Sequence, residues 1–384
     1  MKKMLMIASV ASMIDQFNMT NISILKELGY EVHIAANFEY GNTSSKQRLD
    51  DFKNELDILS VPYWQVDFFR NIYNIKSNYK AYKQIISLIS NNNYDFIHCQ
   101  SPIGGVCGRL AAHKTKTKII YTAHGFHFYK GAPFVNWIFF YPIEKLCAKY
   151  TDILITINKE DYAIAQRLGA KRTVYVPGVG IDSVKYLNTK VDKDEKRKQL
   201  GITEDAFVLL SVGELSRRKN HEVVIKALAE LEKPNLVYLL CGQGILKKKL
   251  KDKAKELNVN IMFLGYRNDI NEIYAAADLF VFPSLQEGLP VALMEAMSAG
   301  LPIVCSKIRG NCDLIENETG GFLTNPNDVN GFSKAIDKIY NSKELREKMK
   351  ICNHNVMKNF DQKIVEEKLR EIYKAIISRY IPNR

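Results

Sequence analysis

The chain has 384 residues, more than one ordinary hydrophobic core accommodates, and this length predicts two large domains. Its 46% apolar and 25% charged residues are typical of a globular protein and exclude a disordered chain. No apolar stretch approaches the roughly 20 residues that a membrane-spanning helix needs. The apolar start Met4–Ile14 is interpreted as a first strand and helix rather than a signal peptide. Seven cysteines without a CxxC pair favour a reduced, cytoplasmic setting over disulfides or a zinc site.

The net charge of +12 is unevenly distributed. Between Arg70 and Lys130 there are nine lysines or arginines and one acid, Asp95, mixed with aromatic residues and followed closely by the apolar run Phe134–Tyr141. Such a mixture suits an anionic membrane surface or nucleic acid. Because no RNP, helix-turn-helix or zinc-finger signature accompanies it, we favour the membrane. The alternative is that the lysines form a solvated face and Phe134–Tyr141 is a core helix.

In the first half of the chain, short apolar runs alternate with amphipathic stretches. This order of strand, helix and strand predicts a parallel sheet covered by helices on both faces. The expected strands are Met4–Ser9, Glu31–Ala36, Asp95–Cys99, Lys118–Thr122, Ile153–Thr156 and Thr173–Val176. The expected helices are Phe17–Leu28, Ile75–Ser90, Val106–His113, Val135–Lys149 and Lys159–Leu168.

The second half repeats the pattern after a break at Pro177–Gly180 and a charged segment, Lys190–Lys198. Its expected strands are Phe207–Val212, Leu236–Cys241, Asn260–Leu264, Leu279–Phe282 and Pro302–Ser306, and its tail is helical. The prediction is an α/β protein with two doubly wound, Rossmann-like parallel-sheet domains facing a cleft, where ligands bind at the carboxyl ends of strands. The first domain is expected to comprise residues 1–178 with a crossover helix at about 362–384, and the second residues 179–361.

The most informative stretch follows the fourth strand of the second domain. It carries Glu287 and Gly288 ahead of a helix that Pro290 can open, and Glu295 lies eight positions after Glu287. The free backbone amides of Gly288 and Leu289 lie at the positive end of the helix dipole, which is a site for a phosphate or diphosphate. The two carboxylates can accept hydrogen bonds from hydroxyls on either side of that anion. This layout predicts a site for a nucleotide sugar.

A cationic segment, Gly213–His221, directly follows the strand Phe207–Val212. A diphosphate leaving group gains negative charge as the glycosidic bond breaks, so fixed cations there would lower the barrier. Lys219 is the first candidate for this role, followed by Arg218 or Arg217. The alternative is a solvated cluster at the start of the next helix.

Three other strand ends supply further candidates. Glycines at Gly242–Gly244 allow close approach of the backbone to a phosphate or ribose, although a plain turn explains them equally. Tyr266 and Arg267 can hold a base. In the first domain, the neutral imidazole of His124 can hydrogen-bond a sugar or its phosphate. The DxD sequence Asp192–Asp194 lies in the charged linker instead of at a strand end, so no metal is expected.

The run Gln286–Met297 resembles the Glu-x7-Glu signature of the retaining family 4 glycosyltransferases, which have the two-domain GT-B fold. The resemblance covers essentially the whole chain and extends to the Lys219 segment, His124 and the Gly-rich link Pro177–Asp182. The segments Ala123–Tyr129, Tyr141–Lys145 and Gly213–Leu215 are similar to the subgroup that builds bacterial capsular and extracellular polysaccharide.

The resemblance implies that Glu287 and its following amides contact the donor sugar, that Glu295 binds the ribose, and that Lys219 with an arginine holds the diphosphate. It also implies metal independence and retention of the anomeric configuration. The chain departs from the family at Glu214, where an arginine is usual, which makes Arg218 the expected second cation. The loop after the first strand also lacks the family's usual glycines, so the acceptor side is less defined.

The sequence therefore predicts a cytoplasmic, retaining glycosyltransferase, peripheral at the inner face of the plasma membrane. It is expected to move a hexosyl or N-acetylhexosaminyl group from a UDP-linked donor to a lipid-linked saccharide in capsular or extracellular polysaccharide synthesis, with no cofactor and no nucleic acid. A nucleotide-sugar epimerase or hydrolase on the same fold is the alternative enzyme. A basic nucleic-acid-binding protein is the alternative outside the enzymes.

Overall fold

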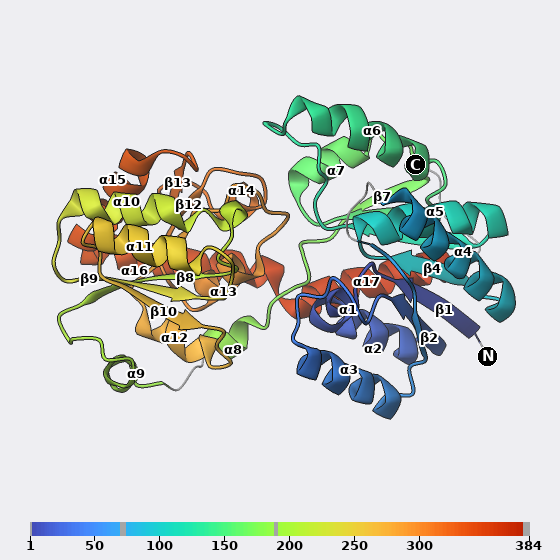
Figure 1. Cartoon of the computed structure of the whole chain (residues 1–384), viewed down its shortest axis with the longest axis horizontal. Helices are drawn as coiled ribbons and strands as arrows, with labels where there is room; N and C mark the ends of the chain where they lie inside the picture. The colour runs from blue at the N-terminus through green and yellow to red at the C-terminus, as the bar shows by residue number, and fades with distance from the viewer. Residues whose placement is uncertain (1, 70–73, 188–190, 379–384) are drawn as a thin grey trace. The chain divides into compact units, whose positions relative to one another are not determined.

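The computed structural model describes residues 2–69, 74–187 and 191–378. The chain divides into two compact units: unit 1 contains residues 1–179 and 363–384, and unit 2 contains residues 180–362. Each unit is built on one parallel sheet with helices packed against it (Figure 1). Within the described ranges, no helix has both the length and the apolar composition needed to cross a membrane.

Unit 1 contains a seven-stranded sheet in the order β3-β2-β1-β4-β5-β6-β7. Strand β1 lies inside the sheet between β2 and β4, and its last four residues are buried, which explains the uninterrupted apolar run at its end. The strands are β1 (Lys2–Ile7), β2 (Tyr30–Ala36), β3 (Tyr63–Gln65), β4 (Phe96–Cys99), β5 (Lys118–Ala123), β6 (Ile153–Thr156) and β7 (Arg172–Tyr175). The helices are α1 (Ala11–Phe17), α2 (Met19–Glu27), α3 (Lys46–Ile58), α4 (Ile75–Asn92), α5 (Pro102–Thr115), α6 (Phe134–Ala148), α7 (Lys159–Ala165) and α17 (Gln362–Ile377).

Unit 2 contains a six-stranded sheet in the order β10-β9-β8-β11-β12-β13. Its strands are β8 (Phe207–Val212), β9 (Leu236–Cys241), β10 (Ile261–Gly265), β11 (Leu279–Phe282), β12 (Ile303–Ser306) and β13 (Gly321–Thr324). Its helices are α8 (Ser183–Leu187), α9 (Lys193–Gln199), α10 (His221–Leu231), α11 (Lys247–Glu256), α12 (Ile270–Ala276), α13 (Val291–Ser298), α14 (Asn311–Leu314), α15 (Val329–Asn341) and α16 (Lys343–Met357), with 3-10 turns η1 (Arg217–Lys219) and η2 (Lys358–Phe360).

The predicted fold class is confirmed, and the strands β6, β8, β9 and β11 have the predicted bounds. Two strands were not predicted, β3 and β13, and each forms one edge of its sheet. Both are short, and β3 is only half-buried, so neither has the long apolar run by which a central parallel strand is recognised. Both segments are strands because they form hydrogen bonds with a neighbouring strand, which their local sequence does not indicate.

The last helix, α17, packs on unit 1, as Figure 1 shows. Its buried side chains Val365, Leu369, Ile372, Tyr373 and Ile376 belong to the same core as β1, β2 and β4. Lys118 on β5 also donates to the backbone oxygen of Ile376 at 2.8 Å. Helix α17 is therefore part of the structural core of unit 1.

A buried ion pair joins α5 to α6 in unit 1. Arg109 has no exposed surface, and its Nη1 lies 2.7 Å from Oε2 of Glu144. Its Nε donates to the backbone oxygen of Gly105 at 2.9 Å, and its guanidinium lies 3.9 Å from the ring centroid of Tyr121. A buried charge is tolerated only when it is paired in this way, so the pair fixes the position of α6 on α5.

We predict that Arg109→Leu lowers the free energy of unfolding by about 3–5 kcal/mol, because it leaves the Glu144 carboxylate buried without its partner. The double variant Arg109→Leu/Glu144→Leu should lose less, since no unpaired charge remains. Urea unfolding followed by circular dichroism measures both. A double variant less stable than the single one would show that the pair is not the source of the loss.

Candidate functional site

The predicted site residues of unit 2 follow the carboxyl ends of β8, β9, β10 and β11. Strands β8 and β11 are neighbours in the sheet although they are not consecutive in the chain. After β8 the chain continues to β9 on one side of this pair, and after β11 it continues to β12 on the other side. Such a switch point is where open parallel sheets bind ligands. Lys219 follows β8 and Glu287 follows β11, and the sheet order brings their loops together.

Glu287 is the centre of a charge cluster. Its Oε1 accepts from Nζ of Lys219 at 2.8 Å and from Nη1 of Arg218 at 2.8 Å. The side chains of Glu287 and Lys219 are each only 11% exposed, whereas that of Arg218 is 44% exposed. Burial lowers the pKa of Lys219, and the neighbouring Glu287 carboxylate opposes that shift. Of Arg217 and Arg218, both described by the structure, it is Arg218 that contacts Glu287.

Hydrogen bonds to backbone oxygens join these two loops. The amide of Leu285 donates to the backbone oxygen of Arg218 at 2.8 Å, and Asn220 Nδ2 donates to that of Pro283 at 3.2 Å. The ammonium group of Lys219 also lies 4.5 Å from the ring centroid of Phe282, the last residue of β11. The cations are thus positioned by secondary-structure ends, not by flexible side chains alone.

Two glycines allow neighbouring loops to approach closely. Gly242 has φ of +148°, and a Cβ there would overlap the backbone oxygen of Gly213. Gly310 has φ of +77°, and a Cβ there would overlap the backbone oxygen of Gly288. Side chains rarely adopt these conformations, so glycine is required at both positions. The result is a close approach of the neighbouring loops around the charge cluster.

Gly288 and Leu289 lie between β11 and α13, as predicted. Among the residues that the structure describes, the N–H groups of Gly288 and Leu289 donate no backbone hydrogen bond. They lie just before Pro290, the N-cap residue of α13, and have donor capacity that an anion can use. Helix α13 begins at Val291, directly after Pro290.

Arg309 was not predicted. It follows β12, is only 7% exposed, and donates from Nε to the backbone oxygen of Glu287 at 3.1 Å. It therefore adds a third cation beside the loop that carries Glu287. A basic residue followed by glycine, three residues after a predicted strand, was the signal that could have identified it.

Glu295 lies on α13 and is held by two tyrosines. Tyr186 donates from its hydroxyl to Oε1 at 2.7 Å, and the hydroxyl of Tyr274 lies 3.0 Å from Oε2. Burial raises the pKa of Glu295, and the two tyrosine hydroxyls oppose that shift. Tyr186 was not predicted because it is 109 residues away in the chain, on the short helix α8.

The remaining candidates of unit 2 differ in their surroundings. A Cβ on Gly244 would overlap the backbone oxygen of Leu215, so the loops after β8 and β9 interlock there. Tyr266 is 76% exposed. Arg267 donates from Nε to Oδ1 of Asp269 at 2.7 Å, so a carboxylate already binds its guanidinium. The structure therefore connects Gly244 to the loop that leads to Lys219, and places Arg267 in a separate ion pair.

His124 belongs to unit 1, where it ends a chain of hydrogen bonds that is buried from Gln100 onward and partly buried at His124. Its Nε2 lies 2.9 Å from Oε1 of Gln100, whose Nε2 lies 2.8 Å from Nε2 of His98. The Nδ1 of His98 lies 3.0 Å from the hydroxyl of Tyr373 on α17. Since an amide oxygen only accepts, this arrangement assigns the proton of His124 to Nε2 and leaves its Nδ1 as an acceptor.

We predict that stability falls as the pH decreases from 6.5 to 4. Burial lowers the pKa of His124 to about 4 and that of His98 to about 3, whereas an unfolded histidine titrates near about 6.5. Below pH 6.5 the unfolded state therefore binds more protons, and this contribution to stability is complete only above that value. His124→Asn should make the decline shallower. Urea unfolding at stepped pH measures it, and an unchanged slope would contradict the prediction.

Comparison with known proteins supports an enzymatic role for both units. Residues 6–158 match the family model of glycosyl transferase 4-like proteins, and residues 192–353 match that of glycosyl transferases group 1. The first match lies within unit 1 and the second within unit 2.

Full-length relatives agree with these matches. The chain is 34% identical to the protein named as glycosyltransferase EpsD in Bacillus subtilis, over 97% of each chain. It is 32% identical to UDP-Gal:alpha-D-GlcNAc-diphosphoundecaprenol alpha-1,3-galactosyltransferase of Escherichia coli, over 79% of this chain and 81% of the relative. It is 24% identical to the capsular polysaccharide biosynthesis glycosyltransferase CapM of Staphylococcus aureus, over 93% of each chain.

Solved structures share the fold. The crystal structure of Anabaena HepE in complex with UDP-glucose matches with a TM-score of 0.77 at 20% identity, over 98% of this chain and 100% of that one. The same two-sheet architecture, of GT-B type, therefore occurs in a protein crystallised with a nucleotide sugar. With the family models and the full-length relatives, this shows that the chain belongs to the family 4 glycosyltransferases.

Proposed function

We propose that the protein transfers a sugar from a UDP-linked donor to a lipid-linked saccharide, with retention of the anomeric configuration. The observation that carries the donor half is the cluster in which Lys219 and Arg218 both contact Glu287, with Arg309 beside it. Cations exceed carboxylates there, and such a cluster beside the start of a helix suits a diphosphate.

The cluster can assist the departure of the nucleotide. As the bond between C1 of the sugar and the diphosphate oxygen breaks, the negative charge that develops on the diphosphate is stabilised by Lys219 and Arg218. The acceptor hydroxyl oxygen bonds to C1 on the same face, and its proton passes to the departing diphosphate oxygen. In this proposal Glu287 orients a donor-sugar hydroxyl, and Glu295 binds the ribose. Because side-chain cations supply the positive charge, the reaction needs no metal.

The acceptor half is supported by unit 1 and by the names of relatives. The E. coli relative is named for an acceptor carried on diphosphoundecaprenol, and CapM is named for capsular polysaccharide synthesis. The Nδ1 of His124 can accept a hydrogen bond from a sugar hydroxyl. The basic residues of unit 1 favour an anionic membrane surface, so we place the protein at the inner face of the plasma membrane, in capsular or extracellular polysaccharide synthesis.

We predict that Lys219→Met lowers kcat/KM by at least about 100-fold, as loss of a preorganised charge at a leaving group does. Glu287→Gln should lower kcat/KM comparably, because it weakens the proposed contact with the donor sugar and removes the charge that pairs with Lys219 and Arg218. The matched control is Arg217→Met, an exposed neighbour, which should stay within about twofold. Transfer of radiolabelled sugar from UDP to a lipid-linked acceptor measures this, and NMR of the product gives its anomeric configuration.

Near-normal turnover in both variants, with unchanged thermal stability, would overturn the site assignment. Inverted configuration in the product would overturn retention. Donor hydrolysis at the same rate with and without acceptor would replace transfer by hydrolysis as the activity.

We predict that Tyr186→Phe raises the donor KM about tenfold with little change in kcat. Its hydroxyl holds Oε1 of Glu295, and a hydrogen bond to a charged group contributes about 1.5–3 kcal/mol. Loss of ground-state binding changes KM, whereas loss of a contact made only in the transition state changes kcat. The stabilisation of the variant by UDP in a thermal-shift assay should fall in parallel. A lower kcat at unchanged donor KM would show that Tyr186 acts elsewhere.

A further inference from the structure

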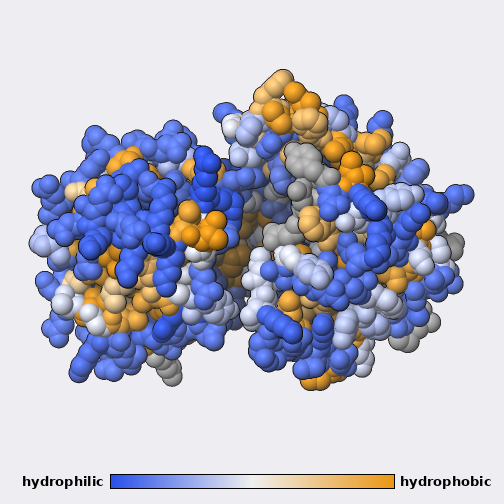
Figure 2. Space-filling model, viewed as in Figure 1, coloured by the Kyte–Doolittle hydropathy of each residue, from blue (hydrophilic) through white to orange (hydrophobic). Residues whose placement is uncertain are grey.

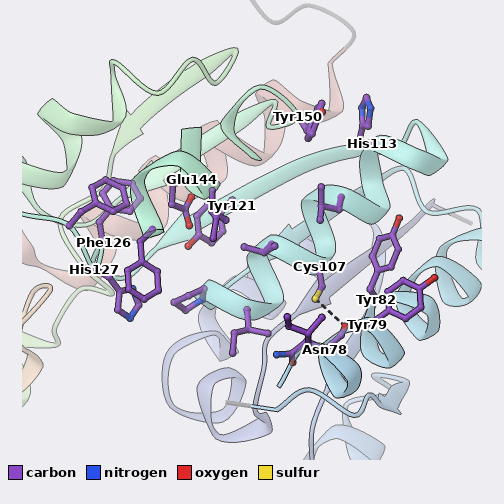
Figure 3. Close-up of a pocket in the computed structure, with 18 of the residues that line it drawn as sticks. Asn78, Tyr79, Tyr82, Cys107, His113, Tyr121, Phe126, His127, Glu144 and Tyr150 are labelled. Atoms are coloured by element: carbon purple, nitrogen blue, oxygen red, sulfur yellow. Dashed lines mark hydrogen bonds between the residues drawn. The ribbon is translucent and has the colours of Figure 1, made fainter. Parts of the chain in front are cut away.

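Unit 1 contains a large apolar groove that the proposed reaction does not use. Its volume is about 560 Å³, within the range of small-molecule sites. The groove follows α5, with α4 on one side and the β5–α6 loop and α6 on the other, as Figure 3 shows. Its lining is mainly aromatic and aliphatic, and includes Tyr79, Tyr82, Val106, Leu110, Phe126 and Phe140.

The negative charge in the lining of the groove is neutralised by a buried arginine. Glu144 is the acid in the lining, and it is paired with the buried Arg109 at 2.7 Å. Tyr121, which also lines the groove, covers that guanidinium with its ring. The groove therefore suits a hydrocarbon ligand rather than an ionic one.

Helix α6 extends this apolar surface to the outside of the molecule. Its inner face packs Trp137, Phe140 and Tyr141 against the core of unit 1. Its outer face leaves Phe134 and Phe139 exposed, at 77% and 59%, and Val135, Ile138, Ile143 and Leu146 are exposed as well. Figure 2 shows apolar surface at the position of α6. An exposed apolar patch of this kind marks an interaction site.

The loop that closes one end of the groove also carries His124. Gly125, Phe126 and His127 line the groove, while His124 and Gln100 line a separate small recess of mixed character, in which Asn21 and Thr122 lie beside apolar residues such as Phe17 and Leu369. Polar side chains of this loop thus lie next to the end of an apolar groove. That arrangement suits an amphiphile, with a polar head joined to a hydrocarbon chain.

Exposed cations surround this region. Lys114 lines the groove, and Lys130, Lys145 and Lys149 are exposed beside α6, whose one acid is the buried Glu144. Cations beside an apolar groove complement an anionic group at the start of a hydrocarbon chain. A diphosphate that links a saccharide to a polyprenol has this chemistry.

We propose that the groove along α5 binds the first isoprene units of the polyprenyl chain of a lipid-linked diphosphate saccharide. This inference rests on the proposed function, since it assigns a binding site to the hydrocarbon chain of the proposed acceptor. The continuous outer face of α6 then receives the rest of the chain, where it meets the membrane. Lipid recognition would thereby be built into the scaffold that carries His124.

The test compares two acceptors with the same diphosphate saccharide, one on a long polyprenyl chain and one on a methyl group, both in the same detergent. The wild type should use the long-chain acceptor with a kcat/KM at least about tenfold higher, equivalent to about 1.4 kcal/mol of additional binding. Leu110→Asp, which places a charge in the groove, and Val106→Trp, which fills it, should each reduce that preference to about twofold or less. Transfer to the methyl acceptor should stay within about twofold in both variants.

The matched control is Ile58→Asp in α3, an exposed apolar residue of unit 1 that does not line the groove. It should keep the preference for the long chain. Both groove positions are partly exposed, so the variants should fold, and thermal unfolding checks this.

A second measurement uses vesicle co-sedimentation. Phosphatidylcholine vesicles that contain polyprenyl phosphate should bind the wild type more tightly than vesicles with the same amount of phosphatidylglycerol, and Leu110→Asp should remove the difference. Equal binding to the two anionic lipids would show that the groove takes bilayer acyl chains or none, and would overturn the proposal.

The outcomes separate the two proposals. Equal wild-type activity on both acceptors would overturn the tail site and leave the transferase function intact. No transfer to either acceptor would contradict the proposed function, and the vesicle measurement would then decide the groove by itself. An unchanged chain-length preference in two folded groove variants would place the tail elsewhere.

Discussion

The candidate donor site depends on one carboxylate that holds two cations from a different strand. Glu287 follows β11, while Lys219 and Arg218 follow β8, and these strands become neighbours only through the order of the parallel sheet. A lysine as buried as Lys219 requires a partner, because burial opposes its charge. The ion pair therefore keeps a positive charge at the carboxyl ends of the strands, and the glycines around it let the neighbouring loops approach closely.

The site residue of unit 1 is organised by polar contacts in the same way. His124 is linked through Gln100 and His98 to Tyr373, so the helix at the end of the chain contributes to the orientation of a histidine near its first third. In low-dielectric surroundings, a polar group of such a chain that lacks a hydrogen-bond partner destabilises the fold. Helix α17 thus has two roles, since it also supplies apolar side chains to the core of unit 1.

The sequence left two interpretations of helix α6 open, a core helix or a membrane-facing one. The core description holds for its inner face, while contact of its exposed outer face with a membrane stays a proposal. The inner face packs on the core and is fixed by the pair of Arg109 with Glu144, whereas the outer face exposes Phe134 and Phe139. An all-round apolar helix of 15 residues cannot be divided into two such faces from periodicity alone, because neither face is polar.

The sequence by itself determined the alternation of strands and helices, the two sheets and the strand ends that carry Glu287, Lys219 and His124, because buried parallel strands and their loops have local signatures. Only the tertiary structure decided the partners of these residues. Arg309 is 22 residues from the carbonyl it contacts, and Tyr186 is 109 residues from Glu295. Edge strands, buried ion pairs and the apolar groove likewise form where distant segments meet. The local hydrophobic periodicity of the sequence does not indicate which segments those are. The motif of Glu287 and Glu295 was therefore recognisable in the sequence, whereas the contacts of its carboxylates with cations and tyrosines were established by the fold.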